Sequence, residues 1–335
     1  LLPMGFGAIL VNLPVAVEGT GVQHVLDTLF SIGIEGAELF PLMLFIGIGA
    51  MIDFTPLLTN PKLMIFGAAA QFGIFFTLGA ASLLGFDIRD AASIAIIGAA
   101  DGPTSIFVAT ELGSKYLGAI MVAAYSYMAL VPLVQPPIIK LCTTKAERKI
   151  KMQYKGKPVS KLTKILFPIV VTMIVALVAP DAVALIGFLM FGNLIRECGV
   201  MNSISETAQN VLANLITIFL GITIASQMKA SEFLQLDTLI IIGLGLVAFV
   251  FDTFGGIMVA KIMNLFSKEK INPMIGAAGI SAFPMSARVV HKLGLEEDNQ
   301  NFLLMHSIGV NVSGQIASVI AGGLILALVK AMIGG

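Results

Sequence analysis

Residues 91–109 read AASIAIIGAADGPTSIFVA, and Asp101 is the only charged residue between Asp90 and Glu111. A carboxylate at membrane depth costs roughly 2.5 to 3.5 kcal/mol even on lenient insertion scales, unless a cation, a proton or hydrogen bonds compensate it. The Gly-Pro pair that follows breaks a helix. A broken helix at that depth frees backbone carbonyls, which are good ligands for a hard cation. This stretch therefore predicts a membrane segment that is interrupted at an ion site.

The composition is that of an integral membrane protein. The chain has 335 residues, of which 57% are hydrophobic and 12% charged, and its mean hydropathy is +0.96. A soluble globular domain carries about 25% charged residues. A chain of this length accommodates about ten transmembrane segments of roughly 20 residues with their loops. We therefore expect an all-α polytopic membrane protein, and the net charge of zero gives no reason to expect a nucleic-acid partner.

Positive charge is concentrated in one loop, residues 140–164, which holds nine of the twenty Lys and Arg residues. The positive-inside rule places such a loop in the cytoplasm. A further role as a docking surface for an acidic soluble partner stays open. Lys261, Lys268 and Lys270 form a smaller basic loop. Because about four spans of ordinary length separate the two loops, we expect them on the same side.

Apolar length and helix breakers predict the membrane segments. The stretch 17–35 is short and mixes polar with apolar residues, and we expect it to lie at the membrane interface. The expected segments are 1–16, 36–53, 62–85, 90–100 with 103–113, 116–140, 164–179, 181–196, 206–228, 234–254, 271–292 and 299–333. The last of these is long enough for two segments or one kinked segment.

Two pairs of motifs predict an internal repeat. FIGIGAMID at 45–53 is similar to FLGITIASQ at 219–227, and GAADG at 98–102 is similar to GAAGI at 276–280. Interrupted segments at matching positions of two halves mark the binding site in many transporters, and such halves often have opposite topology. Chance similarity between Gly/Ala-rich sequences is the alternative. The expected parts are a first membrane repeat, a basic cytoplasmic loop and a second, inverted membrane repeat, at 1–140, 141–163 and 164–335.

The first break offers oxygen ligands for Na⁺. Asp101, Thr104 and Ser105 supply a carboxylate and two hydroxyls beside the carbonyls that the break frees. The carboxylate is equally suited to carry a proton. Asp101 is also a good N-cap for a half-helix that begins at Pro103, a role that can coexist with ion binding.

Tyr125 and Tyr127 are two of only four tyrosines, and they lie within one span. Two residues apart on a helix, they point about 200° from each other, so both cannot face lipid. We expect at least one phenol to face the core, where its hydroxyl needs a partner. An interfacial aromatic belt is the alternative.

The second break lies within 271–288 and combines a cap, a hydroxyl and a cation. Asn272 is suited to cap a half-helix that begins at Pro273. Ser281 offers a hydroxyl beside unwound backbone. Arg288 is suited to bidentate capture of a carboxylate, although it is also placed to extend toward the interface.

A polar run at 305–315 contains His306 and Asn311 within an apolar segment. Asn311 either joins the ion site or binds two helices together in the membrane. For His306 we expect a packed or hydrogen-bonded role, since no second metal ligand stands at useful spacing.

These motifs resemble a known family. GAADGPT at 98–104, YSY at 125–127, GNLIRECG at 192–199 and the stretch from Asn272 to Arg288 are similar to the membrane-embedded beta subunit of the sodium-pumping, biotin-dependent decarboxylases. That group includes the oxaloacetate, methylmalonyl-CoA, glutaconyl-CoA and malonate decarboxylases. The resemblance covers essentially the whole chain.

The resemblance implies an activity and a set of partners. The family's beta subunit decarboxylates carboxybiotin, and this step drives Na⁺ outward while a proton from outside is consumed. Biotin is carried on a partner subunit. The implied partners are a carboxyltransferase alpha subunit, a biotin carrier protein and a small single-span gamma subunit, in a homo-oligomeric assembly in the cell inner membrane.

The resemblance also implies site residues. Asp101, Tyr127 and Arg288 are expected to take part in catalysis, and Na⁺ is expected at Asp101, Asn272 and Ser281. The remaining expected substrate- and ion-binding positions are Tyr125, Gly276 and Asn311. We hypothesise that Na⁺ and a proton compete for Asp101.

Two other functions compete with this one. A secondary ion or solute transporter with inverted repeats and no chemistry of its own fits the residue patterns equally well. A non-catalytic membrane anchor fits poorly, because an anchor has no use for a charge at membrane depth.

Overall fold

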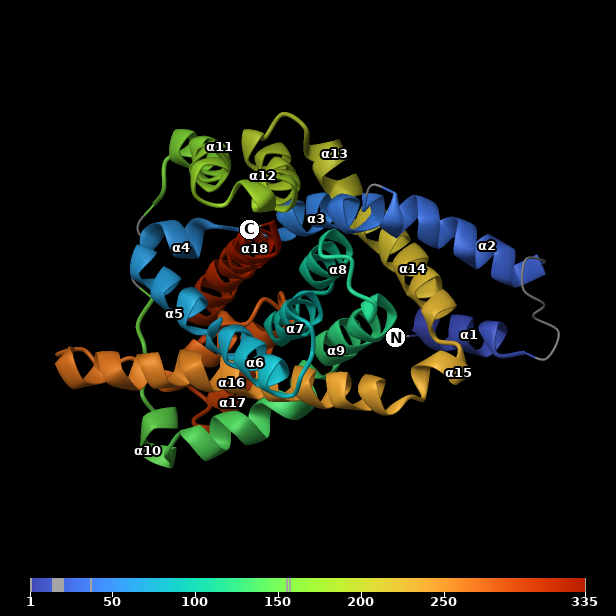
Figure 1. Cartoon of the computed structure of the whole chain (residues 1–335). Helices are drawn as coiled ribbons and strands as arrows, with labels where there is room; N and C mark the ends of the chain where they lie inside the picture. The colour runs from blue at the N-terminus through green and yellow to red at the C-terminus, as the bar shows by residue number, and fades with distance from the viewer. Residues whose placement is uncertain (1, 14–20, 37, 155, 157, 335) are drawn as a thin grey trace.

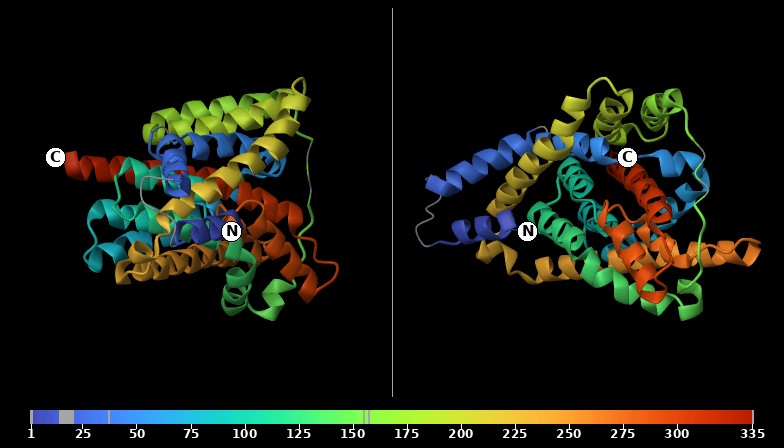
Figure 2. Two further views of the ribbon diagram at one scale, coloured as in Figure 1. Left: turned by 90° about the vertical axis from the view of Figure 1, so that its right-hand side faces the viewer. Right: turned by 180° about the vertical axis from the view of Figure 1, so that it is seen from behind.

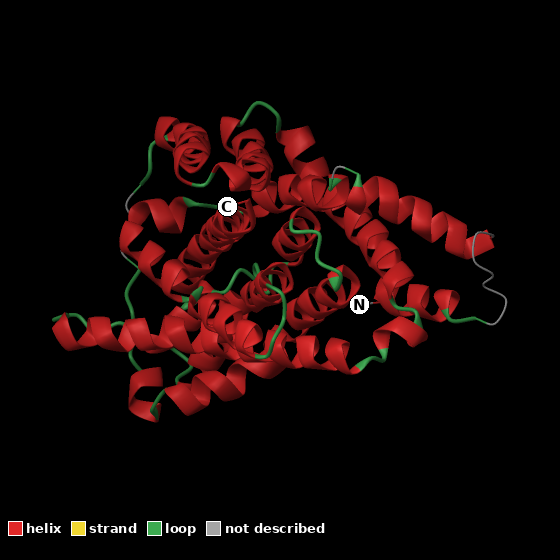
Figure 3. Ribbon diagram, viewed as in Figure 1, coloured by secondary structure: helices red, strands yellow, loops and turns green. Residues whose placement is uncertain are grey.

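The computed structural model describes residues 2–13, 21–36, 38–154, 156 and 158–334. Every regular element in these ranges is a helix, and they contain no strand (Figures 1 and 3). The all-α class predicted from the composition is therefore confirmed.

Six helical stretches of the described chain are long and apolar enough to cross a membrane. A bent pair, Gly21–Glu35 with Leu39–Met51, gives a possible seventh. The six are Pro61–Leu83 (η2 Pro61–Leu63, α5 Met64–Ala69, α6 Phe72–Leu83), α9 Leu117–Cys142, α11 Lys161–Val178, Asn202–Gln227 (α13 Asn202–Glu206, η5 Thr207–Leu212, α14 Ala213–Ile224, η6 Ala225–Gln227), α16 Leu236–Phe266 and α18 Leu304–Gly334.

The shorter elements explain why the count falls below the expected ten or so. The two interrupted regions divide into pieces that are each too short to span, and the segment expected at 181–196 forms a helix of only 16 residues. The remaining elements are α1 Leu2–Val11, α2 Gly21–Phe30, η1 Ser31–Glu35, α3 Leu39–Met51, α4 Thr55–Thr59, α7 Ile88–Ala95, η3 Ile96–Ala99, α8 Gly102–Glu111, α10 Lys145–Arg148, η4 Pro180–Ala182, α12 Val183–Cys198, α15 Ala230–Phe233, η7 Pro273–Gly279 and α17 Met285–Glu297.

Several predicted boundaries change. The segment expected at 299–333 is one continuous helix, α18, and the segment expected at 234–254 continues twelve residues further in α16. The region expected at the interface, 17–35, forms α2 and η1 from Gly21 onward, while its first residues and the end of segment 1–16 lie outside the described residues.

Both predicted breaks are present. The first lies between η3 and α8, where Ala100 has a left-handed backbone (φ 51°) and Asp101 an extended one. The second lies between η7 and α17, where residues 280–284 leave the helical conformation. The two breaks meet directly, because the backbone N–H of Ser281 donates to the carbonyl of Ala99 at 3.0 Å. In Figure 1 the short helices α7 and α8 lie at the centre, between α9, α16 and α18.

Glycine permits this close approach of backbones. A Cβ atom on Gly276 would overlap the carbonyl of Gly256 in α16, and one on Gly314 in α18 would overlap the carbonyl of Gly279. The η7 segment is therefore held between α16 and α18 by backbone contact.

The motif at 192–199 has a packing role. Gly192 in α12 lies against the carbonyl of Ile46 in α3, and Asn193 donates to the carbonyl of Ile52 at 2.9 Å. Asn193 is 1% exposed. This motif therefore fastens α12 to α3 and does not reach Asp101.

The outer helices present apolar faces that the chain itself does not cover. Only 11% of the most apolar window of α11 is buried, and Leu162, Met173 and Leu177 are exposed. Such a surface would be unfavourable in water and is suited to lipid. The chain is therefore a multi-pass membrane protein. Figure 2 shows the C-terminus and the basic loop at opposite ends of the helix bundle.

Candidate functional site

Asp101 lies at the centre of a buried polar cluster. It is 3% exposed and caps α8, since its Oδ1 accepts from the backbone N–H of Thr104 at 3.4 Å. Its Oδ2 accepts from the hydroxyl of Thr104 at 2.8 Å and that of Ser281 at 3.0 Å. Gln315 Nε2 and Ser318 Oγ, both on α18, also lie 3.0 Å from Oδ2. Three segments that are distant in sequence thus converge on one carboxylate oxygen.

The donors at Asp101 can be rearranged. Hydroxyl groups carry lone pairs as well as a proton, so Thr104, Ser281 and Ser318 can turn from donating to the carboxylate to coordinating a cation. In the described chain no Lys, Arg or His bonds to Asp101, and no group of three His, Cys, Asp or Glu residues could hold a metal. One carboxylate with hydroxyl and amide oxygens suits a hard monovalent cation or a proton better than a transition metal.

Asn311 and Tyr125 add two buried oxygens without hydrogen-bond partners. Asn311 donates to the carbonyl of Ile280 at 2.7 Å, and its Oδ1 accepts nothing in the described chain. The ring of Tyr125 packs on the first break, because a Cβ on Gly102 would lie 2.5 Å from it, and its hydroxyl is likewise unpartnered. Unsatisfied buried oxygens are costly, so both are candidates to face a bound ion.

Tyr127 belongs to a different face of α9. Its hydroxyl donates to the backbone carbonyl of Ile242 in α16, and its ring lies beside Gly245. Tyr125 and Tyr127 are 8% and 6% exposed, so both phenols face the protein interior and neither forms an interfacial belt. The structure brings only Tyr125 toward the first break.

Asn272 caps η7, as the sequence predicts, but does not join Asp101. Its Oδ1 accepts from the N–H of Met274 at 3.1 Å. Its amide donates to the carbonyls of Arg148 and Ile150, each at 2.9 Å. Asn272 therefore ties the start of η7 to the basic loop, and its side chain is fully engaged there.

Gly276 and Arg288 also lie apart from the cluster. Gly276 is a backbone contact with α16 that leaves no room for a side chain. Arg288 is exposed on α17, with no side-chain bond to the described residues. The exposed position is compatible with binding an incoming carboxylate and equally with reaching the membrane interface.

Sequence reasoning missed Gln315 and Ser318 as partners of Asp101. With Asn311 they stand at i, i+4 and i+7 on α18 and therefore share one helical face. This polar stripe in an apolar span is visible in the sequence. A second missed network joins Gln135 Nε2 to the carbonyl of Ala277 at 2.7 Å and to the hydroxyl of Ser286 at 3.0 Å.

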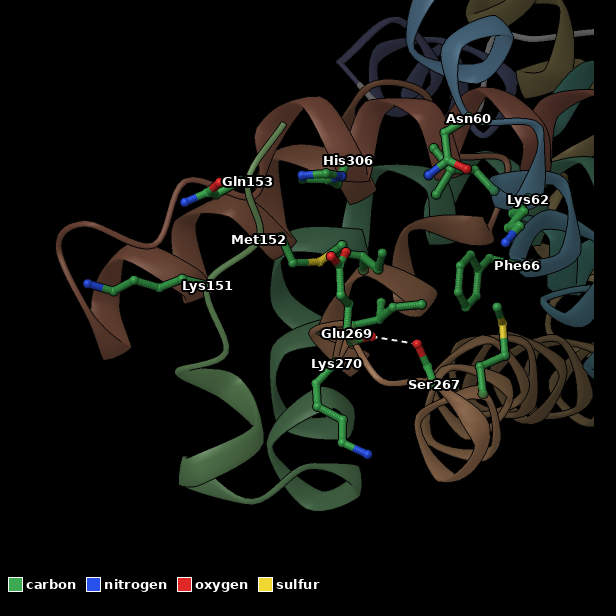
Figure 4. A pocket seen from close by; sticks show the side chains of 14 residues that line it. Asn60, Lys62, Phe66, Lys151, Met152, Gln153, Ser267, Glu269, Lys270 and His306 are labelled. Carbon is green, nitrogen blue, oxygen red and sulfur yellow. Dashed lines mark hydrogen bonds between the residues drawn. The ribbon is translucent and has the colours of Figure 1, made fainter. Parts of the chain in front are cut away.

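A cavity of about 580 Å³ opens beside the start of η7, at the end of the bundle that carries the basic loop (Figure 4). It is lined by three lysines, Lys62, Lys151 and Lys270, with one acidic side chain, Glu269. His306 borders it, packed edge-on against Tyr154 at 5.7 Å. Other lining residues are Asn60, Leu63, Phe66, Met152, Gln153, Met263, Ser267, Ile271 and Ile275.

Ion pairs fix the basic loop to the end of α17. Arg148 Nε lies 2.6 Å from Glu297 Oε1, and Lys151 Nζ lies 3.1 Å from Asp298 Oδ2. The backbone N–H of Gln300, together with Lys151, lowers the pKa of the Asp298 carboxyl below its ordinary value of 3.8. The loop is thus held over the cavity from both α17 and η7.

The fold and the site define a polytopic helical membrane protein whose buried carboxylate lies between two interrupted segments. Residues 1–329 match the family described as the Na⁺-transporting oxaloacetate decarboxylase beta subunit, and the chain belongs to that family. The resemblance seen in the sequence motifs is therefore confirmed.

The names of the similar proteins specify two different substrates, oxaloacetate and methylmalonyl-CoA. The chain is 55% identical over 304 residues to the oxaloacetate decarboxylase beta chain of Haemophilus ducreyi, a match that covers 89% of this chain and 70% of the relative. It is 55% identical over 303 residues to that of Klebsiella pneumoniae, with the same coverage. It is 48% identical over 352 residues to the methylmalonyl-CoA decarboxylase subunit beta of Propionigenium modestum, which covers 98% of this chain and 88% of the relative.

Proposed function

We propose that this chain is the membrane subunit of a Na⁺-translocating decarboxylase, which decarboxylates carboxybiotin held on a partner subunit and couples this step to outward Na⁺ transport. The observation that carries the proposal is the convergence of both breaks and α18 on Asp101 Oδ2. Family membership supports Na⁺ as the transported ion and decarboxylation as the reaction.

The proposed Na⁺ site is built from Asp101 and Ser281, with the unpartnered Oδ1 of Asn311 as a further ligand. Asn272 acts on this site through the position of η7, since its own amide binds the basic loop. Tyr125 lies against the same break and is placed to hold or pass a proton there.

The cavity beside the start of η7 is the proposed entry for the carboxylated group. Its lysines give it a positive potential that attracts an anion, and its size is within the range of about 300–1,000 Å³ that is usual for small-ligand sites. Arg288, exposed on α17, is a candidate to hold the carboxylate in a bidentate pair. Carboxybiotin would supply the driving force, because loss of CO₂ leaves a ureido nitrogen that takes up one proton.

Coupling follows from competition at one oxygen. Na⁺ at Asp101 requires the ionised carboxylate, whereas protonation removes the charge that holds Na⁺. Binding of a proton and of Na⁺ would therefore alternate. The two halves of the chain, 1–140 and 164–335, would form an inverted repeat around this site, with movement of one helix group against the other giving access from either side.

The partners and the orientation are part of the proposal. The loop 141–163 would lie in the cytoplasm and face the carboxyltransferase alpha subunit and the biotin carrier protein. A single-span gamma subunit and further copies of this chain would complete the complex in the membrane.

The test uses the intact complex in lipid vesicles, energised with oxaloacetate or methylmalonyl-CoA. Radioactive Na⁺ uptake is measured with and without avidin, which sequesters biotin. We expect avidin to abolish uptake. Uptake that survives avidin would instead establish a secondary transporter with no chemistry of its own, the second function that the buried cluster alone would support.

A further inference from the structure

The middle of α16 holds a second buried carboxylate, Asp252, which the cluster around Asp101 does not include. Asp252 is 0% exposed, and its Oδ1 accepts from the backbone N–H of Ile74 at 3.2 Å. Its Oδ2 is buried with no hydrogen-bond partner in the described chain. Half of this carboxyl group therefore lacks the compensation that a buried charge requires.

Two glycines close around the carboxyl group. A Cβ on Gly73, near the start of α6, would lie 2.7 Å from Oδ1, and a Cβ on Gly98, in η3, would lie 2.6 Å from Oδ2. The same Cβ on Gly98 would lie 2.6 Å from the Cβ of Ala248. Gly98 stands three residues before Asp101 in the chain, so Asp252 contacts the first break from α16.

The surroundings of Asp252 bring no basic side chain to it. The elements α5, α6, η3 and η7, all packed against α16, contain no titratable residue. Tyr127 of α9 donates to the carbonyl of Ile242, ten residues earlier in α16. The other titratable residues of the elements packed most extensively on α16 are Arg89 and Asp90 of α7 and Tyr125, Lys140 and Cys142 of α9. The charged residues of α16 itself are Asp237, near its start, and Lys261, which pairs with Glu147 of α10.

We propose that Asp252 is a proton-binding site, separate from the Na⁺ site at Asp101. The inference rests on the proposed Na⁺ transport and assigns its proton to a carboxyl of its own. A Na⁺ ion needs several oxygen ligands around it, whereas Oδ2 lies against Gly98, which is itself packed on Ala248. A proton needs no such space: a hydronium ion gives one proton to Oδ2 and becomes water, and the carboxyl group changes from a charge of −1 to neutral.

The position of the Asp252 carboxyl group links its protonation to movement of the first break. With η3 against α16, the ionised form is uncompensated at Oδ2, so this packing favours the neutral acid. Movement of η3 away from α16 would admit water and favour release of the proton. The proton would thus be released when the segment that carries Asp101 moves.

Asp252→Asn tests this inference in the intact complex in vesicles. Asn keeps an oxygen for the N–H of Ile74 and removes the titration. Na⁺ uptake and alkalinisation of the vesicle lumen are recorded together over a range of pH. We expect the ratio of protons consumed from the lumen to Na⁺ transported to fall severalfold, the pH dependence to flatten, and the Na⁺ concentration for half-maximal rate to stay that of the unsubstituted complex.

Thr253→Val is the matched control. Thr253 is the next residue, is fully buried and has an unpartnered hydroxyl, so an isosteric methyl should leave the pH profile unchanged. An Asp252→Asn complex with an unchanged pH profile and proton ratio would overturn the inference and leave Asp252 with only its hydrogen bond to the backbone N–H of Ile74. Loss of Na⁺ stimulation in that variant would also overturn it, by placing Asp252 in the Na⁺ site.

A second measurement needs no variant and covers the case in which Asp252→Asn does not assemble. A hydrophobic carbodiimide, which reacts with protonated carboxyl groups, is applied to the unsubstituted complex, and modified peptides are identified by mass spectrometry. We expect modification of Asp252 that declines as pH rises and is indifferent to Na⁺. No modification at any pH, or protection by Na⁺, would contradict the inference. Failure of the proposed function is distinct, because the unsubstituted complex would then show no avidin-sensitive Na⁺ uptake.

Discussion

Asp101 and Asp252 are both buried carboxyl groups without a basic partner, but their surroundings differ in kind. Asp101 Oδ2 is met by side-chain donors from α8, the second break and α18. Asp252 is met by a backbone N–H and by the main chain of two glycines. Side chains can turn and exchange partners, whereas backbone cannot. We therefore expect the first environment to admit an ion that needs several ligands, and the second to admit only a proton.

The largest expected effect is the loss of Na⁺-dependent activity when Asp101 is substituted, which would distinguish the role of Asp101 from that of Asp252. In Asp101→Asn, we expect Na⁺-stimulated decarboxylation and Na⁺ uptake to fall by about a hundredfold or more, the scale on which a positioned acid–base group contributes. Asn caps a helix nearly as well as Asp, so the complex should still assemble. Rates are measured in vesicles against Na⁺ concentration. Full Na⁺ stimulation in this variant would remove Asp101 from the proposed site.

A second test addresses the side-chain donors that distinguish Asp101. Gln315→Ala removes one donor to Oδ2, and a hydrogen bond to a charged group contributes about 1.5–3 kcal/mol. We expect the Na⁺ concentration for half-maximal rate to change by about tenfold, the factor that 1.4 kcal/mol represents. Ser313→Ala on the same helix is the control, because Ser313 bonds only to the backbone carbonyls of Leu63 and Val310. Equal behaviour of the two variants would argue against Gln315 as part of the site.

A third test addresses the backbone enclosure of Asp252. Gly98→Ala places a methyl group against Asp252 Oδ2 and Ala248, and overpacking of this kind costs about 1–3 kcal/mol. We expect a lower thermal unfolding temperature of the purified protein in detergent. Gly79→Ala, at a position on α6 with nothing within 4 Å, should be neutral or slightly stabilising. Indistinguishable unfolding temperatures for the two variants would mean that η3 does not press on Asp252.

The smallest effect is expected at the surface carboxylate Asp298. Its lowered folded pKa means that its contribution to loop attachment is present above pH 3.8 and is lost as the pH falls through the lowered value. We expect Asp298→Asn to loosen the basic loop slightly at neutral pH, seen as faster limited proteolysis within the loop, with no change in Na⁺ dependence. The basic loop of the unsubstituted chain should be cleaved as fast as that of the variant only at acidic pH. A change in Na⁺ dependence would show that the loop reports directly on the ion site.

The breaks, the cap at Asn272 and the buried carboxylate at Asp101 could be predicted because each has a local signature. The Gly-Pro pair after an apolar run identifies the first interruption, and the Asn-Pro pair identifies the start of η7. The partners of Asn272 could not be predicted, because they are backbone carbonyls of a loop more than a hundred residues away. No residue type in that loop indicates them.

Asp252 shows how a boundary error conceals a site. With a segment expected to end at residue 254, Asp252 falls two residues from the end, where a carboxylate is unremarkable. Because α16 continues to Phe266, Asp252 lies at mid-span instead. The helix extends over polar residues such as Lys261, which pairs with Glu147 of the basic loop at 3.2 Å, because apolar length no longer decides whether the chain stays helical at that end.

The hydrogen bond from Ser281 to Ala99 is made by main-chain atoms alone. Substitution of either side chain leaves its donor and acceptor in place, proline at position 281 excepted. The η7 segment, which leads into the second break, is anchored at its start by Asn272 to the basic loop. One stretch of ten residues, 272–281, therefore spans the distance from the loop that would meet partner subunits to the buried carboxylate. A displacement imposed at the loop has a short, covalently continuous route to the ion site.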